Sequence, residues 1–182
     1  MKFEDVLNNG KLWAVVYDGC NENILTKTIS NWVNIDYLTK FFCENVEDLE
    51  KYFKITNIDA AIYDTITDAA TLSCLILDVS PDANLEQLFR PLEPSRYSEM
   101  VLSREKAKGK SVSGHPSWLR IYAIKLDNGI YLVTGGAIKL THLMEERQHT
   151  LDELKRMEQV RNYLIDNGVL DVDGLYEYND EI

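Results

Sequence analysis

The chain has 182 residues, of which 45% are apolar, and carries a formal net charge of −11. This apolar fraction excludes a largely disordered chain, and the length is sufficient for one domain with a core. No run approaches the roughly 20 apolar residues of a membrane span, and the N-terminus lacks the basic and apolar segments of a secretory signal. The three cysteines match neither a zinc pattern nor a disulfide framework, so we expect reduced cysteines and a cytoplasmic protein.

Charge is distributed unevenly along the chain. Residues 101–143, called the basic island below, have seven lysines and arginines against two acidic residues, which gives +5 there and −16 elsewhere. An acidic total normally counts against nucleic acid as a partner, whereas a local excess of basic residues favours it. The basic island therefore keeps a nucleic-acid partner open.

The first half of the chain is predicted to be one strand followed by helices. Residues 1–11 have no clear pattern and are expected to be a frayed lead-in, whereas the apolar run Leu12–Tyr17 predicts a strand. Apolar residues then recur at helical spacing over residues 23–45, with a break before Asp36, the candidate N-cap of a second helix. Val46–Phe53 is expected to add a turn or two of helix.

The next segments mix helical and extended patterns. A cap at Asn57 or Asp59 is predicted to begin a longer helix, because small and apolar residues follow at helical spacing. Leu85–Phe89 is predicted to form a short helix. Tyr97–Arg104 is a candidate first strand of a meander, and the polar stretch Glu105–Pro116 indicates a long loop or the splayed tips of a strand pair.

The stretch Ser117–Thr141 predicts two strands joined by a short Asp-Asn-Gly turn. Because both faces of this hairpin carry apolar residues, we expect it in the middle of a sheet. Gly135-Gly136 interrupts the second strand and indicates a bend or bulge. The first strand is expected to present five residues on one face: Trp118, Arg120, Tyr122, Ile124 and Leu126.

The C-terminal part is predicted to be one helix and a tail. Thr150–Glu153 matches a capping box that starts the helix, and Asn167-Gly168 ends it. The acidic residues 169–182 are expected to form an exposed tail or a short addition. The sequence thus predicts a single α+β domain over residues 1–182: a twisted, mostly antiparallel sheet with helices packed on it, an elongated helical first half (about 23–78) and a C-terminal helix.

Familiar catalytic motifs do not appear in the sequence. There is no glycine-rich phosphate loop and no motif of a catalytic serine or cysteine. His142 and His149 are seven residues apart with two glutamates between them, a spacing that raises the question of a metal site. No third ligand has a matching spacing, so surface or capping histidines are the favoured interpretation. We predict no metal and no cofactor.

The basic island carries the remaining chemical signal. Arg104, Lys106 and Lys108 alternate, so they share one face if that segment is extended. Together with residues of the neighbouring strands they would suit RNA, since cations hold phosphate and an aromatic ring can stack on a base. They would also suit metal-independent RNA cleavage, in which a base, a phosphorane-stabilising cation and an acid are needed. Composition alone favours the simpler interpretation that these are solubilising charges, with Tyr122 in the core.

The second half of the chain resembles the RelE/HigB superfamily of bacterial and phage toxins. The similarity spans roughly Leu85–Leu164 and rests on an ordered series of short motifs: Leu88–Leu92 (LFRPL), Arg120-Ile121-Tyr122, the apolar strand Ile130–Thr134, Lys139-Leu140-Thr141, and Thr150 at the start of a helix. The resemblance implies an α+β domain with a twisted antiparallel sheet flanked by helices. It also implies ribosome-dependent mRNA cleavage without a metal, neutralised by an antitoxin protein.

The resemblance also implies roles for residues of the basic island. Lys106 and Lys108 would be general-base or phosphate-clamp residues, and Arg120 would stabilise the phosphorane. Lys139 or His142 would take the place of the C-terminal acid or basic group. Three further residues are RNA-binding candidates, the last two through stacking: Arg104, Tyr122 and Tyr131.

Two classes of function follow from these observations. In the first, the protein is a toxin-like endoribonuclease that acts on mRNA at the ribosome and has a cognate antitoxin. In the second, the toxin-like fold is a non-catalytic binding module whose acidic surface contacts a basic protein partner. Neither class involves a membrane.

Overall fold

The protein is built around a six-stranded sheet in the order β1-β2-β6-β5-β4-β3. This computed structural model describes residues 1–80, 83–92, 102–108, 111, 114–127 and 129–180. The strands are β1 (Lys2–Asp5), β2 (Leu12–Val16), β3 (Phe89–Pro91), β4 (Arg104–Lys108), β5 (Leu119–Asp127) and β6 (Ile130–Ile138). β2 and β6 are parallel, and every other neighbouring pair is antiparallel. The predicted α+β class with a mostly antiparallel sheet is confirmed.

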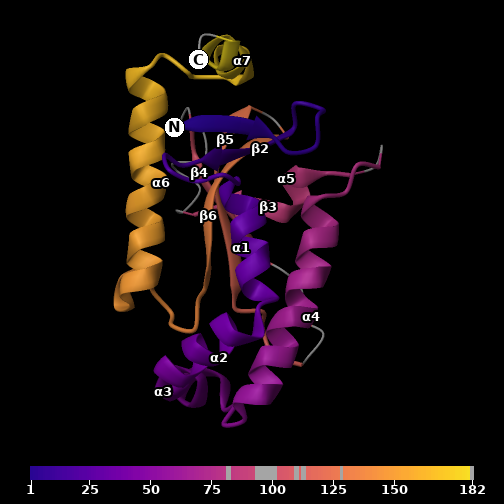
Figure 1. Cartoon of the computed structure of the whole chain (residues 1–182), viewed down its shortest axis with the longest axis vertical. Helices are drawn as coiled ribbons and strands as arrows, with labels where there is room; N and C mark the ends of the chain where they lie inside the picture. Colours follow the sequence, from indigo (N-terminus) through magenta and orange to yellow (C-terminus); the bar gives the residue numbers. More distant parts are fainter. Residues whose placement is uncertain (81–82, 93–101, 109–110, 112–113, 128, 181–182) are drawn as a thin grey trace.

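Helices cover both faces of the sheet (Figure 1). One face carries α1 (Ile24–Trp32), α2 (Ile35–Glu44), α4 (Ile58–Ile76) and α5 (Leu85–Leu88), and the short α3 (Val46–Asp48) and the π-helical η1 (Leu49–Phe53) follow α2. The other face carries α6 (Gln148–Asp166), which the 3-10 turn η3 (Met144–Glu146) precedes. The last helix, α7 (Val172–Asp180), lies beside β1. No helix in the described part of the chain combines the length and the apolarity needed to cross a membrane.

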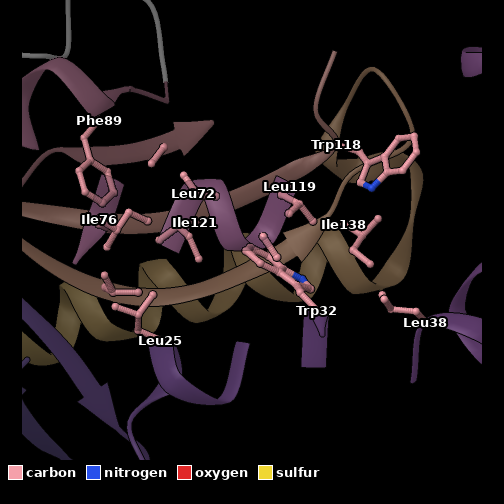
Figure 2. Packing of buried hydrophobic residues seen from close by; sticks show 14 of the residues in the cluster. Leu25, Trp32, Leu38, Leu72, Ile76, Phe89, Trp118, Leu119, Ile121 and Ile138 are labelled. Carbon is pink, nitrogen blue, oxygen red and sulfur yellow. The ribbon is translucent and has the colours of Figure 1, made fainter. Parts of the chain in front are cut away.

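Each face of the sheet has its own apolar layer. On one face, Leu25 and Trp32 of α1 and Leu72 of α4 are buried in the same cluster as Leu119 and Ile121 of β5 (Figure 2). On the other face, the stripe of Met157, Val160 and Leu164 on α6 packs in one cluster with Tyr122 and Ile124 of β5. Burial of each large side chain stabilises the fold by about 1.5–3 kcal/mol. The sheet is therefore fixed from both sides.

The predicted hairpin lies at the centre of the sheet, as expected. β5 and β6 pair with each other and are flanked by β4 and β2, and Gly129 in the turn has a φ of +73°. Tyr122 pairs with Gly135, whereas the next residue, Ala123, pairs with Val133. The register therefore shifts by one residue of β6 at this point. This irregularity is the predicted bulge.

Trp118 does not share the face expected of it. It precedes β5 rather than continuing its alternation, and it is buried with the cluster on the α1–α4 side. Its indole Nε1 donates to Thr65 Oγ1 on α4 at 2.9 Å. The alternation holds from Leu119 onward, so Arg120 and Tyr122 keep their predicted common face.

Both ends of the chain are more ordered than the sequence indicated. Residues 1–11 are not a frayed lead-in, because Lys2–Asp5 forms the antiparallel strand β1 against β2 and buries Phe3. The acidic C-terminal residues form a short addition rather than an exposed tail, the second of the two predicted alternatives, because α7 buries Leu175. The side chain of Asn179 donates to the Phe3 carbonyl at 2.9 Å. Each end is stabilised by the other, a long-range contact that local patterns do not reveal.

Three helix starts differ from or sharpen the predictions. The N-cap of α2 is Asn34, whose side chain accepts from the Tyr37 amide, and not Asp36. Of the two candidates for α4, Asn57 is the cap. α6 begins at Gln148, so the proposed capping box at Thr150 lies inside the helix. Thr150 Oγ1 instead donates to the carbonyls of Met144 and Arg147, which ties η3 to the helix.

The predicted strand Tyr97–Arg104 falls mostly on residues 97–101, which lie outside the described residues. The strand that is seen, β4, begins at Arg104 and runs to Lys108. It therefore occupies the first part of the stretch Glu105–Pro116 that was predicted as a loop or strand tips. Five consecutive residue pairs with β5 hold this polar segment in an extended conformation.

Candidate functional site

An open cleft of about 600 Å³ lies on the face of the sheet that α6 covers only in part. Its floor and walls come from β4, β5, the exit of β6, η3 and the first turns of α6. Seven of the eight predicted site residues line it: Arg104, Lys106, Lys108, Arg120, Tyr122, Lys139 and His142. The structure therefore brings together side chains that are up to 38 positions apart in the sequence.

The strand register explains this convergence. Arg104, Lys106 and Lys108 occupy alternate positions of β4 and so share one face. Lys106 pairs across the strands with Tyr122, and Lys108 pairs with Arg120. Residues directly opposite one another in a sheet have neighbouring side chains, and two like charges in that position repel each other. The pair of Lys108 and Arg120 therefore destabilises the unliganded sheet slightly and would gain from a bound anion.

The cations of the cleft are poorly neutralised by the protein. Arg104 Nη1 pairs with Glu158 Oε2 at 2.9 Å. In the described parts of the chain, no carboxylate forms an ion pair with any of the other four cations: Lys106, Lys108, Arg120 and Lys139. Among the lining residues of the cleft, Glu145 is acidic. The cleft thus carries a net positive charge inside an acidic protein.

Burial and mutual repulsion perturb three of these groups. The pKa of Lys108 is lowered, first by burial and then by the charges of Arg120 and Lys106. The pKa of Lys139 is lowered by burial and by the same two charges, against a smaller opposing effect of Glu146. Burial also lowers the pKa of Arg120. Lowered pKa values of cations mark a site where positive charge is crowded and where an anion would be stabilised.

Backbone carbonyls hold two of the cations in place. Arg120 Nη1 donates to the carbonyl oxygens of Ser117 and Leu119, both at 2.7 Å. Lys139 Nζ donates to the Thr141 carbonyl at 2.8 Å and also to the His142 carbonyl. Both groups keep their full charge in these contacts, because the carbonyls are neutral. The result is a pair of positioned cations at the end of the hairpin.

Tyr122 lies under the floor of the cleft. Its side chain is fully buried, and its hydroxyl has no hydrogen-bond partner among the described residues. Burial raises its pKa. A fully buried ring cannot offer an open face to a base, so the predicted stacking role is not supported. What Tyr122 offers is a buried hydroxyl at the cleft, which no described residue pairs with.

Tyr131 does not belong to the cleft. It lies on the opposite face of the sheet, is 2% exposed, and stacks on Phe89 with 4.5 Å between ring centroids. The structure therefore does not bring Tyr131 together with the other predicted site residues. In an unbroken strand, residues an even number of positions apart face the same side. Tyr131 and Val133 face the α1–α4 side, but Ala137 faces the other side, because the bulge lies between Val133 and Ala137.

The two histidines that were considered as metal ligands lie in different surroundings. His142 lines the cleft, and its ring contacts Tyr52 with 4.9 Å between centroids. His149 Nε2 lies 2.9 Å from the Ile138 carbonyl, and its ring packs on Phe41. Within the described ranges, no three His, Cys, Asp or Glu side chains come together as metal ligands would.

Sequence reasoning missed the apolar part of the cleft lining. Leu92, Leu143, Met144 and Leu154 line it beside the cations. These residues give the cleft apolar surface that suits contact with a base or sugar. Only their position next to the basic motifs in sequence could have drawn attention to them, because leucines and methionines are ordinary core residues.

Comparisons with protein-family models, with curated proteins and with solved structures give no match to this chain.

Proposed function

We propose that this protein is a toxin-like endoribonuclease that acts in the cytoplasm, and that its basic cleft binds and cleaves single-stranded RNA. Its substrate would be mRNA on the ribosome, and an antitoxin protein would neutralise it. The observation that carries the proposal is the gathering in one cleft of four cations that form no ion pair with any described carboxylate, on the strands that resemble RelE/HigB-type toxins. An RNA backbone supplies the anionic charge that such a cleft lacks.

The residues of the cleft can supply each proton transfer of the reaction. Lys108 is the preferred base, because its lowered pKa increases the fraction of neutral amine. It would take the proton of the 2′-hydroxyl as the 2′-oxygen attacks the adjacent phosphorus. The bond between phosphorus and the 5′-oxygen then breaks, which leaves a 2′,3′-cyclic phosphate and a 5′-hydroxyl. Lys106 is the second candidate base and phosphate clamp.

Two further groups would act on the developing charge and on the leaving oxygen. Arg120 is held by backbone carbonyls at the end of the hairpin and would stabilise the charged phosphorane. Lys139 would protonate the leaving 5′-oxygen, since its lowered pKa makes its ammonium group a stronger acid. His142 lines the same cleft and is the alternative acid.

Expression in bacteria tests the activity directly. We expect wild-type protein to arrest growth and the double variant Arg120→Ala/Lys106→Ala to relieve the arrest. Loss of one well-placed transition-state donor typically lowers a rate by about 10²–10³-fold. Lys40→Ala/Lys155→Ala is the charge-matched control, since both lysines are exposed and neither lines the cleft. Uninterrupted growth and translation in the presence of wild-type protein would contradict the ribonuclease proposal.

RNA binding tests the cleft independently of catalysis. Four neutralised phosphates predict a slope of about −3 in log affinity against log salt for a single strand, or about 50-fold weaker binding from about 50 to 200 mM salt. The double variant Arg120→Ala/Lys106→Ala should halve this slope, to about 7-fold over the same range. The Lys40→Ala/Lys155→Ala control should keep the wild-type slope. Equal slopes for both variants would place the RNA outside the cleft.

The alternative function is a non-catalytic binding module with an acidic surface. Three exposed apolar side chains at the junction of α1 and α2 favour a protein contact there: Val33, Ile35 and Tyr37. Asp36 lies among them in the sequence and adds acidic charge. Capture of a basic protein by this surface, together with harmless wild-type expression, would support this alternative over the ribonuclease.

A further inference from the structure

A second cleft, of about 480 Å³, adjoins the first. It is formed by η1, by the segment that leads into β5, and by the exit of β6. Arg120, Lys139 and His142 line both clefts. The two clefts are therefore neighbours, together called the groove below, and the positioned cations lie at the boundary between them.

The helical first half of the chain supplies the outer wall of the second cleft. η1 places Tyr52 against His142, with ring centroids 4.9 Å apart and ring planes at 82°. The Tyr52 hydroxyl donates to Glu146 Oε2 at 3.2 Å, which ties η1 to η3. Lys51 Nζ lies 4.8 Å from the centroid of the Tyr52 ring. An aromatic side chain with an adjacent cation thus stands next to the basic island, although it is far from it in sequence.

The rest of the lining of the second cleft, called its opposite wall here, includes both polar and apolar side chains. The His115 ring stacks on the buried Trp118 ring with centroids 4.4 Å apart, and its Nε2 lies 3.3 Å from Asp64 Oδ2. Ser117 and Thr141 also line this wall. The cations of the second cleft are those at its boundary with the first, so its interior suits a base and sugar better than a phosphate.

We propose that the second cleft binds the nucleotide adjacent to the one whose phosphate lies at Arg120 and Lys139, so that the RNA strand crosses the end of the hairpin. In this arrangement the base packs on the Tyr52 ring and on the exposed His142 ring, which contact each other and both line the second cleft. This inference rests on the proposed function, because it assumes that the first cleft holds RNA. It predicts that the groove recognises at least two consecutive nucleotides.

Affinities for a short and a longer probe test this arrangement. Uridine 3′-monophosphate occupies the first cleft alone, whereas a 2′-O-methylated tetrauridylate, which cannot be cleaved, extends into the second. Tyr52→Ala should weaken binding of the tetranucleotide by about 5-fold to 100-fold, the range for loss of a base-stacking contact. The affinity for the mononucleotide should stay within about two-fold of wild type. Tyr52→Phe should keep most of the affinity, because the ring is retained.

Tyr63→Ala is the matched control, because Tyr63 is an exposed tyrosine on α4 that lines neither cleft. Crosslinking of wild-type protein to RNA that carries 4-thiouridine avoids any effect of a substitution on folding. Crosslinks should map to residues 49–53 or 140–142. Equal tetranucleotide affinity of Tyr52→Ala and wild type, with crosslinks only elsewhere, would overturn the second subsite and leave the first. If wild-type protein bound neither probe, both proposals would fall.

Discussion

Replacement of Glu153 by glutamine is expected to change how protein stability depends on pH. Glu153 lies on the inner side of α6, is 8% exposed, and has one carboxylate oxygen without a hydrogen-bond partner among the described residues. Its carboxyl group packs against Gly135, and a side chain on residue 135 would clash with it. Burial raises its pKa from an ordinary 4.5 to about 7, against the opposing charge of Arg156.

The sign of the effect follows from where the proton is held. Between about pH 4.5 and pH 7, the folded protein keeps a proton on Glu153 that the unfolded chain has already lost. The free energy of unfolding therefore falls as the pH rises through this window, and the contribution of Glu153 is constant above it. A shift of about 2.5 pH units, at about 1.4 kcal/mol per unit, corresponds to about 3 kcal/mol.

Urea denaturation of wild type and Glu153→Gln measures this contribution. Glutamine has nearly the shape of glutamic acid but does not titrate, so the two proteins should be similar near pH 5. Near pH 8, the variant should be more stable than wild type by up to about 3 kcal/mol. Glu44→Gln, at an exposed position of α2, should show no such divergence. If the stability gap between Glu153→Gln and wild type did not widen with pH, burial of an acid at this position would be refuted.

Two further substitutions test the packing around the sheet. Thr65→Val removes the acceptor of the Trp118 indole and should lower the free energy of unfolding by about 1–3 kcal/mol in urea denaturation. Thr67→Val is the control: like Thr65, Thr67 donates to the carbonyl four residues earlier, but it does not accept from an indole. The loss for Thr67→Val should be smaller. Gly135→Ala would bring a methyl group to 1.8 Å from a buried carboxylate oxygen and should destabilise the protein by about 1–3 kcal/mol. Gly174→Ala, in ordinary contact on α7, should be neutral or stabilising by up to about 1 kcal/mol in thermal melts.

The sequence contained enough information to predict the floor of the cleft. Strand alternation alone places Arg104, Lys106 and Lys108 on one face, and the alternation in β5 does the same for Arg120 and Tyr122. The meander predicted a strand before the hairpin but placed it at Tyr97–Arg104, whereas the strand that pairs with β5 is Arg104–Lys108. The convergence in the first cleft nevertheless depends on residues 104–108 being extended, which the prediction of a loop or strand tips over Glu105–Pro116 left open.

Other parts of the site depend on contacts that no local pattern encodes. A bulge of one residue in β6 reverses the faces of the strand, so Tyr131, which the family resemblance offered as a stacking residue, lies on the face opposite the cleft. The contact of Tyr52 with His142 joins residues 90 positions apart, and nothing in the sequence around Tyr52 distinguishes it from a core aromatic residue. β1 is only four residues long and is fixed by its partner strand and by α7.

The termination of the sheet has a consequence for any protein partner. At one edge, α7 lies beside β1, and the side-chain amide of Asn179 donates a hydrogen bond to the Phe3 carbonyl. At the other edge, β3 is three residues long and ends in Pro91, which has no amide hydrogen, while Arg90 Nη1 donates to the Phe89 carbonyl. An extended peptide would find few free backbone groups at either edge of the described sheet, so binding by strand addition is disfavoured. We expect an inhibitor of this protein to bind through a helix or through acidic side chains placed in the groove.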